Sequence, residues 1–234
     1  MSSPTLAELL AQRPYPGRGL AVARLRDGER WILYFLTGRS AASRERAIAA
    51  LAGGDLEVRA TAPEASDDPL RHYTAAALRG GTLVVGNGSQ VAPIAEALAS
   101  GADPVTAFAA HSFEPDAPIF TPRIWVVTEQ TDEGRLLLGC AMRSGRPSET
   151  TDHGIWIPDP LDRGEGTMLT TYTGTTEIVT TSTEPASFTT DADDADALID
   201  ELWESLDPHL RVAAVAVHAR AFPAGVLARG RARM

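Results

Sequence analysis

The strongest constraint on this chain is a pair of apolar runs joined by a short polar turn. Residues 20–25 and 31–36 are mostly apolar, and an Asp-Gly-Glu turn at residues 27–29 lies between them. Two strand-like runs around an Asp-Gly turn are typical of a β-hairpin. Residues 123–128 and 136–142 repeat the pattern around a second turn. Antiparallel strands are therefore expected to dominate the fold.

Other elements are predicted from the same kind of pattern. Residues 191–206 give the clearest helix, because their apolar side chains form one stripe and acids gather near the start, where the helix dipole favours them. Residues 72–78 fit a helix or a strand. Residues 144–166 are expected to form a surface loop, in which residues 155–157 could form a short strand. Further strands are predicted at residues 56–60, 82–86, 168–183 and 212–218, and further helices at residues 5–12, 43–52, 94–100 and 104–111.

We assign residues 1–14 to an N-terminal extension and residues 15–234 to a single domain. Within the extension, Thr5 is followed three residues later by Glu8, which is the spacing of a helix capping box. The hairpin-linked strands that follow are interrupted by pairs of helices, and this order favours the α+β class with antiparallel sheets.

The charge balance excludes several classes of partner. The chain has 21 basic and 31 acidic side chains and a net charge of −10, unlike the basic surface of proteins that bind nucleic acid. Cys140 is the single cysteine, so no intrachain disulfide can form. The sequence has no export signal and no apolar segment of about 20 residues. These features predict a soluble, cytoplasmic protein that binds neither nucleic acid nor membrane.

The common catalytic signatures are missing. The sequence has no Gly-rich phosphate loop ending in Gly-Lys-Ser/Thr, no dinucleotide fingerprint, no His-Glu-x-x-His motif and no nucleophile elbow. Its five histidines lack the spacing of metal ligands. We therefore expect no metal site.

Polar residues at the ends of predicted strands are the remaining candidates. Thr37-Gly38-Arg39-Ser40 follows an apolar run and offers N–H groups, a guanidinium and a hydroxyl, which suit a phosphate, although an ordinary turn has the same composition. Gly86-Asn87-Gly88-Ser89 repeats this arrangement. Glu114 and Arg123 could form an acid/base pair or only a salt bridge. Tyr73 could be a proton donor or a packing residue.

Several motifs in a fixed order carry a family resemblance. They are Tyr15-Pro16-Gly17-Arg18-Gly19, Tyr34-Phe35-Leu36-Thr37-Gly38-Arg39-Ser40 with Arg44, Tyr73, Val84-Val85-Gly86-Asn87-Gly88-Ser89, Phe113-Glu114 and Thr121-Pro122-Arg123-Ile124. In this order they resemble the archaeal-type IMP cyclohydrolase family. The resemblance covers roughly residues 15–128, and more weakly the region of Thr171-Tyr172 and the C-terminal helix and strand. It implies an Ntn-hydrolase-like fold with four layers, α-β-β-α, and antiparallel sheets.

The resemblance also implies an activity. The family closes 5-formamidoimidazole-4-carboxamide ribonucleotide to IMP with loss of water, the last step of purine biosynthesis. It implies a non-covalent acid/base mechanism with no metal or cofactor, and Ser2 is not expected to act as an N-terminal nucleophile. By match to the motifs, the catalytic candidates are Tyr73, Glu114 and Asn87, and the substrate-binding candidates are Arg18, Arg39, Ser40, Arg44, Ser89 and Arg123.

Two other functions remain open at this point. The long loop after Met142 and the Thr-rich segment depart from the family pattern, so a related cyclisation of a modified purine or nucleotide analogue is one alternative. A catalytically silent nucleotide-binding module on the same scaffold is the other. The expected partner is a small nucleotide substrate. The sequence leaves the oligomeric state open, although self-association is common for such folds.

Overall fold

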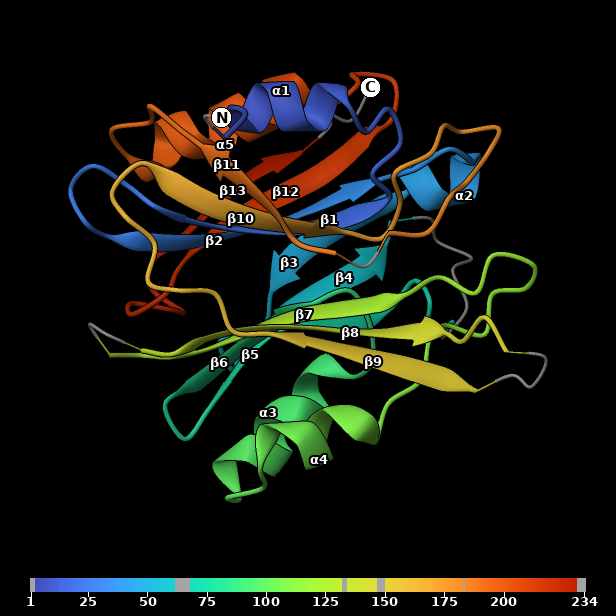
Figure 1. Ribbon diagram of the computed structural model, residues 1–234, viewed down its shortest axis with the longest axis horizontal. Helices are drawn as coiled ribbons and strands as arrows, with labels where there is room; N and C mark the ends of the chain where they lie inside the picture. Colours follow the sequence, from blue (N-terminus) through green and yellow to red (C-terminus); the bar gives the residue numbers. More distant parts are fainter. Residues whose placement is uncertain (1–2, 62–67, 132–133, 147–149, 183, 231–234) are drawn as a thin grey trace.

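Two antiparallel β-sheets packed face to face make up the body of the protein (Figure 1). The computed structural model describes residues 3–61, 68–131, 134–146, 150–182 and 184–230. Within these residues, one sheet has six strands in the order β11-β10-β1-β2-β12-β13, and the other has seven in the order β3-β4-β5-β6-β7-β8-β9. The predicted α+β class with antiparallel sheets is therefore confirmed.

The strands are bounded as follows. The six-stranded sheet consists of β1 (Arg18–Arg24), β2 (Arg30–Thr37), β10 (Glu165–Thr170), β11 (Ala186–Thr189), β12 (Arg211–His218) and β13 (Val226–Gly230). The seven-stranded sheet consists of β3 (Arg46–Ala50), β4 (Leu56–Ala60), β5 (Tyr73–Arg79), β6 (Thr82–Gly86), β7 (Arg123–Glu129), β8 (Leu136–Arg143) and β9 (Thr151–Trp156). The helices are α1 (Leu6–Ala11), α2 (Ala41–Arg44), α3 (Val91–Ala99), α4 (Pro104–Ala109) and α5 (Ala195–Ser205).

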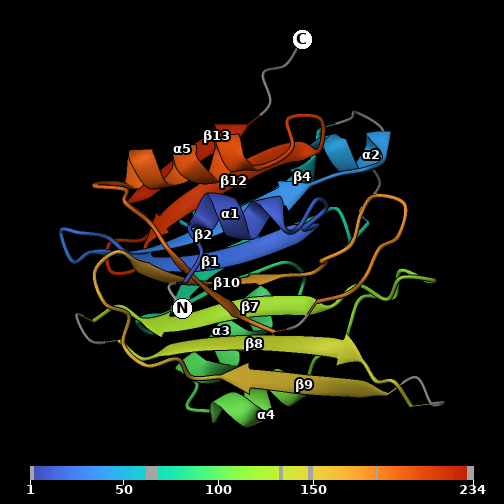
Figure 2. The same cartoon turned by 45° about the horizontal axis from the view of Figure 1, so that its top comes forward.

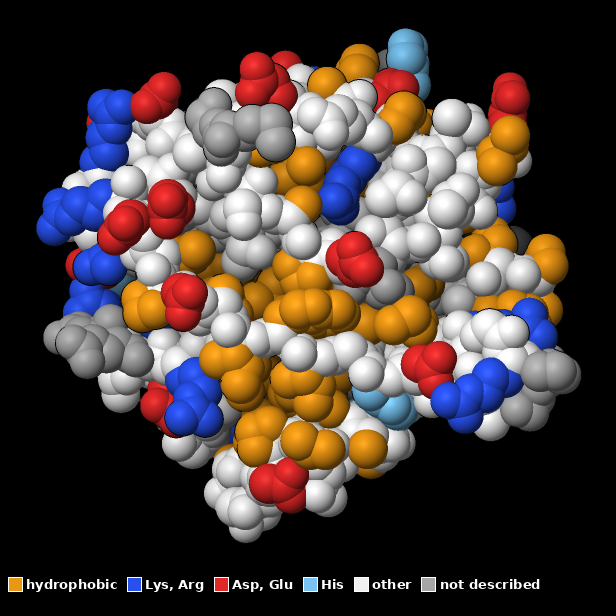
Figure 3. Space-filling view, viewed as in Figure 1, with side chains coloured by type: hydrophobic (Ala, Val, Ile, Leu, Met, Phe, Trp, Pro, Cys, Tyr) orange, Lys and Arg blue, Asp and Glu red, His pale blue; other side chains and the backbone are white. Residues whose placement is uncertain are grey.

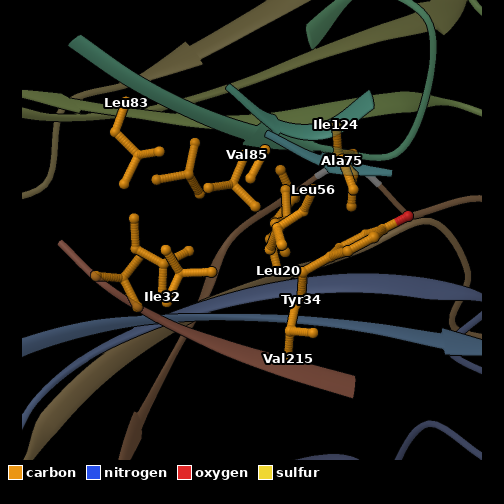
Figure 4. Packing of buried hydrophobic residues seen from close by; sticks show 14 of the residues in the cluster. Leu20, Ile32, Tyr34, Leu56, Ala75, Leu83, Val85, Ile124 and Val215 are labelled. Carbon is orange, nitrogen blue, oxygen red and sulfur yellow. The ribbon is translucent and has the colours of Figure 1, made fainter. Parts of the chain in front are cut away.

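Alternation along the strands sorts the apolar side chains into three cores. Figure 4 shows the central one, in which Leu20, Ile32 and Tyr34 of the six-stranded sheet face Leu83 and Val85 of the other sheet. Because successive strand residues point to opposite faces, their neighbours point outward and need a second cover. Helices supply this cover on the outer face of each sheet.

The helices lie on opposite sides of the molecule (Figures 1 and 2). On the six-stranded sheet, α1 and α5 bury Leu9 and Leu202 against Phe35. On the seven-stranded sheet, α3 and α4 bury Ile94 and Phe108 with Trp125. The Thr5–Glu8 capping box of α1 is confirmed, and the helix of the predicted N-terminal extension is thus part of an outer core. None of the helices in the described part of the chain has the length and apolar composition needed to span a membrane.

Three glycines in the sheets lie directly opposite aromatic residues whose rings cover them. The cross-strand pairs are Gly19 with Phe35, Gly139 with Trp125, and Gly166 with Phe188. In each pair the aromatic ring covers the glycine, so that a Cβ added to Gly139 would lie 2.1 Å from Nε1 of Trp125. Glycine leaves these strands without a side chain to pack, and the ring of the partner fills the space.

Most predicted elements are confirmed, but the helix at residues 43–52 is wrong. Only Ala41–Arg44 is helical, and Arg46–Ala50 forms β3, which pairs with β4. The alanines of this segment favour a helix in isolation. Pairing with Leu56–Ala60 overrides that local preference, because the strand gains a full ladder of hydrogen bonds.

Two further predictions about the second half need correction. The segment at residues 144–166, expected to be a loop with a short strand at 155–157, contains the longer edge strand β9, which begins at Thr151 and ends at Trp156. The strand predicted at residues 168–183 ends at Thr170, and in the described part of the segment beyond it an isolated bridge joins Tyr172 to Thr181. The ambiguous segment at residues 72–78 is the strand β5.

The glycine–aromatic pairs predict that a side chain added at one of these glycines lowers the stability of the protein. Replacing Gly139 with Ala places a methyl group against the Trp125 ring, and overpacking of this kind costs roughly 1–3 kcal/mol. Gly145→Ala is the matched control, because a Cβ there meets no atom within 4 Å. Urea denaturation should show a lower free energy of unfolding for Gly139→Ala alone. Equal stability of the two variants would contradict the packing argument.

Candidate active site

A cavity of about 260 Å³ opens at one end of the two sheets. It lies where β1 begins and β2 ends, beside α2 at the right of Figure 1. The described residues that line it are Tyr15, Gly17, Arg18, Thr37, Arg39, Ser40, Ala42, Ser43, Arg46, Leu70, Arg71, Glu114, Asp116, Ile119 and Tyr172. Four arginines and two carboxylates in one small space mark it as the candidate site.

A buried ion pair between Arg18 and Glu114 forms one wall of this cavity. The two guanidinium nitrogens Nη1 and Nη2 donate to Oε1 and Oε2 at 2.8 and 2.7 Å. Arg18 is 7% exposed and Glu114 is 2% exposed. Such a two-point contact fixes the planes of both groups. The sequence suggested Arg123 as the partner of Glu114, but in the structure the partner is Arg18.

Local structure positions both partners. Arg18 is the first residue of β1, and its Nη1 also contacts the Asn87 carbonyl oxygen at 3.4 Å. Glu114 lies in the loop before β7, where its N–H donates to the Thr121 carbonyl at 2.9 Å. Asp116 tightens the same loop by accepting hydrogen bonds from the Thr121 N–H and hydroxyl. These hydrogen bonds within the loop fix the backbone from which the Glu114 carboxylate extends.

Burial and charge act in opposite directions on this pair. Burial raises the pKa of Glu114, and the charge of Arg18 offsets only part of that rise. Burial would lower the pKa of Arg18, but the charge and the hydrogen bond of Glu114, together with Tyr73 and Tyr172, outweigh burial and raise that pKa, so the guanidinium stays protonated. A carboxylate with a raised pKa at a cavity wall is suited to accept a proton near neutral pH.

Three more arginines surround the cavity and bond only to backbone carbonyls among the described residues. Arg39 donates to the Thr176 carbonyl at 3.0 Å. Arg46 donates to the carbonyls of Ser43 and Thr37, and Arg71 donates to that of Ala42 at 3.2 Å. The Nε atom of Arg71 is buried and has no hydrogen-bond partner in the part of the chain that the structure describes. These guanidinium groups have donors left for an anionic ligand, and their planar forks match phosphate oxygens.

Two tyrosines with different settings lie near the ion pair. Tyr172 lines the cavity, its hydroxyl lies 2.5 Å from the Thr121 hydroxyl, and its ring stacks on Tyr15. Burial raises the pKa of Tyr172, so its hydroxyl stays protonated and can donate. The Tyr73 hydroxyl instead lies 2.7 Å from that of Tyr34 in the core, and Tyr73 is not among the lining residues.

Asn87 holds the backbone of the site. Its side-chain nitrogen donates to the Pro122 carbonyl at 2.9 Å, and its oxygen accepts from the Ile124 N–H at 2.6 Å. The residue is fully buried. The structure therefore does not bring the Asn87 side chain to the cavity, and its contacts tie the end of β6 to the start of β7.

Ser89 and Arg123 form a separate group beyond the loop of Gly88. Arg123 donates to the Ser89 hydroxyl at 2.6 Å and to Gln90 Oε1 at 3.2 Å. Neither residue lines the cavity. The charge of Arg123 still lowers the pKa of Glu114 slightly, after burial and Arg18 have acted.

The candidate residues that follow β2 do not all line the same cavity. Arg39 and Ser40 line the cavity, and the Ser40 side chain caps α2 by accepting from the Ser43 N–H at 3.1 Å. Arg44 lines a different hollow, between β3 and β12, and donates to the Arg39 carbonyl at 2.9 Å. The sequence candidates that share the cavity are thus Arg18, Arg39, Ser40 and Glu114.

Sequence reasoning did not select the other charged residues that line the cavity, Arg46, Arg71 and Asp116, and it did not select Tyr172. Arg71 lies two positions before Tyr73, and Asp116 two positions after Glu114, so proximity to a motif was the available signal. Tyr172 lay in the weakly matched Thr171-Tyr172 region. In the described part of the chain, no group of three or more His, Cys, Asp or Glu side chains gathers as metal ligands would.

Comparison with known proteins agrees with the motif order. The chain matches the family described as IMP cyclohydrolase-like protein over residues 15–221. A search of curated proteins finds no significant match. The matched segment contains the Arg18–Glu114 pair and every residue that lines the cavity. Because the match covers most of the sequence, this chain belongs to the IMP cyclohydrolase-like protein family.

Proposed function

We propose that this protein is a cyclohydrolase that closes 5-formamidoimidazole-4-carboxamide ribonucleotide to IMP with loss of water. The observation that carries the proposal is the buried Arg18–Glu114 pair on a cavity that also holds Arg39, Arg46 and Arg71. Membership of the family supports a cyclohydrolase reaction. We also infer that the helices on both outer sheet faces form the α-β-β-α layers of an Ntn-hydrolase-like fold.

The arginines beside α2 are proposed to bind the 5′-phosphate. Arg39, Arg46 and Arg71 have no carboxylate partner among the described residues, and Ser40 lies beside them. A phosphate monoester at this position would accept several charge-assisted hydrogen bonds. The base of the substrate would then extend toward Arg18 and Glu114.

Ring closure needs one proton acceptor and one proton donor. The carboxamide nitrogen forms a bond to the formyl carbon and gives up a proton, while the formyl oxygen gains one and becomes a hydroxyl. The hydroxyl then leaves as water with the proton of the formamido nitrogen, and a carbon–nitrogen double bond forms. Both reacting groups are on one molecule, so holding them in contact supplies much of the rate.

Glu114 and Tyr172 have the settings for these two roles. Each Glu114 oxygen accepts one hydrogen bond from Arg18 and keeps a further lone pair for the carboxamide N–H. Tyr172 also lines the cavity, and its hydroxyl is the proposed donor to the formyl oxygen. Arg18 orients Glu114, while Asn87 and Tyr73 are proposed as positioning residues behind it.

Incubating the full chain with the formyl-carboxamide ribonucleotide and following IMP by absorbance tests the proposal directly. Turnover supports it. Binding of IMP without turnover would indicate a silent nucleotide-binding module, and neither binding nor turnover would indicate another substrate.

Glu114→Gln is expected to lower kcat about 100-fold, because the loss of a general base typically costs 10²–10⁴-fold. The base acts in its ionised form, so kcat/KM should fall on the acidic side. Because burial raises the Glu114 pKa, the midpoint of this fall should lie above the ordinary value for glutamate. The pH profile of kcat/KM measures it, and a wild-type profile that stays flat down to pH 4.5 would exclude Glu114 as the base.

The two tyrosines provide a matched pair of variants. Tyr172→Phe removes a hydroxyl from the cavity lining, and kcat should fall at least tenfold if this group donates the proton. Tyr73→Phe removes a hydroxyl that bonds to Tyr34 in the core, and its effect should be smaller. Steady-state kinetics compare them, with thermal melts to show that both variants fold. A larger loss in Tyr73→Phe would reverse the assignment.

Arg39→Gln should raise KM about tenfold and change kcat little, because its proposed contact is to the phosphate rather than to the reacting atoms. Arg59→Gln is the control, since Arg59 is an exposed arginine on β4 outside the cavity. An unchanged KM in Arg39→Gln would place the phosphate elsewhere.

A further inference from the structure

A second cavity, of about 520 Å³, lies at the opposite end of the two sheets. Strand β1 begins at Arg18 in the first cavity and ends at Arg24 in the second one. Its length separates the two places by about 20 Å, at 3.3 Å per residue. The β1–β2 turn, the start of β8 and residues 158–161 meet here, at the left of Figure 1.

Basic side chains line this second cavity. Arg24, Arg30 and Arg135 contribute to its wall, and Asp159 is the one acidic side chain among the described lining residues. Figure 3 shows Lys/Arg side chains along this edge of the molecule, at the left of the view, with Asp/Glu side chains among them. A local excess of positive charge is notable on a chain whose net charge is −10. This comparison of charges covers the described lining residues, and Asp132 and Glu133 are not among the described residues.

The two arginines on the strands have no carboxylate partner among the described residues. Arg30 donates from Nη1 to the Gly134 carbonyl at 2.8 Å, and its buried Nε has no hydrogen-bond partner in the described part of the chain. Arg24 donates to the carbonyls of Gly28 and Leu161 at 3.3 and 3.2 Å. Burial and then the charges of Arg24 and Arg220 lower the pKa of Arg30.

Other arginines on the same edge form ion pairs with carboxylates, unlike Arg24 and Arg30 in the part of the chain that the structure describes. Arg26 pairs with Asp191 at 2.5 Å, and Arg220 pairs with Glu29 at 2.5 Å. Grouping like charges around a partly buried guanidinium is unfavourable unless an anion compensates them. Among the described residues, Arg24 and Arg30 have no such compensating carboxylate, and an anionic ligand would supply one.

We propose that the second cavity binds a small organic anion, with one phosphate or carboxylate group on an apolar body. The anionic group lies against the guanidinium groups of Arg30 and Arg135, which both line the cavity. The apolar body lies against Leu136, Pro158 and Leu161, which also line the cavity. The cavity volume of about 520 Å³ falls within the range of small-molecule sites, roughly 300–1,000 Å³.

Amide NMR titrations of the full chain test this proposal and locate the site. The probes are phenyl phosphate, benzoate and neutral phenol. Saturating shifts of the Gly28 and Gly134 amides with either anion, and none with phenol, are expected. Gly17 and Gly38 report on the first cavity, so binding in the two places is distinguished. The tighter of the two anions identifies the preferred group.

Charge variants give the second readout. Arg135→Gln removes an exposed charge and should weaken binding about threefold, while Asp159→Asn should tighten it by a similar factor. Arg30→Gln removes the partly buried donor and should weaken binding at least tenfold, with a thermal melt to verify the fold. Arg59→Gln, on β4, should leave the affinity unchanged.

Three outcomes would overturn the proposal. The first is shifts confined to the amides of Gly17 and Gly38. The second is equal shifts with phenol and phenyl phosphate, since an anion site requires the charge. The third is the same affinity in Arg135→Gln and Arg59→Gln. None of these depends on cyclohydrolase turnover, so the proposed function can stand or fail separately.

Discussion

The buried contact between Arg18 and Glu114 is the interaction on which the candidate site depends. Each charge loses its hydration on burial, and the two-point hydrogen bond compensates for that loss only in one geometry. Removing one partner of such a pair typically costs roughly 3–5 kcal/mol. Because Arg18 belongs to one sheet and Glu114 to the loop before a strand of the other, the contact also fixes how the sheet ends meet around the cavity.

Antiparallel topology explains why both cavities lie at sheet ends. Strand ends carry backbone groups and polar side chains that cannot be buried in the central core, and hairpins bring several such ends together. The same hairpin, β1–β2, contributes Arg18 and Thr37 at one end and Arg24 and Arg30 at the other. All 21 basic residues are arginine, and this residue offers a planar fork of donors to anions where lysine offers a point charge.

Local signals allowed much of the fold to be predicted. The β1–β2 hairpin follows from two apolar runs around Asp27-Gly28, and the capping box of α1 follows from Thr5 and Glu8. Prediction failed where pairing partners decide the structure. The segment Arg46–Ala50 favours a helix by composition and becomes a strand because β4 lies beside it. Strand β9 lacks an apolar run because it lies at a sheet edge.

The sequence by itself determined the antiparallel α+β class, the family resemblance and the candidacy of Glu114, because these depend on local patterns and motif order. Only the tertiary structure decided that Arg18 is the partner of Glu114, that Tyr172 and Arg71 line the same cavity, and that Arg44 faces another one. Residues separated by 96 positions, such as Arg18 and Glu114, meet only after both sheets have formed. Spacing along the chain has no information about such a meeting.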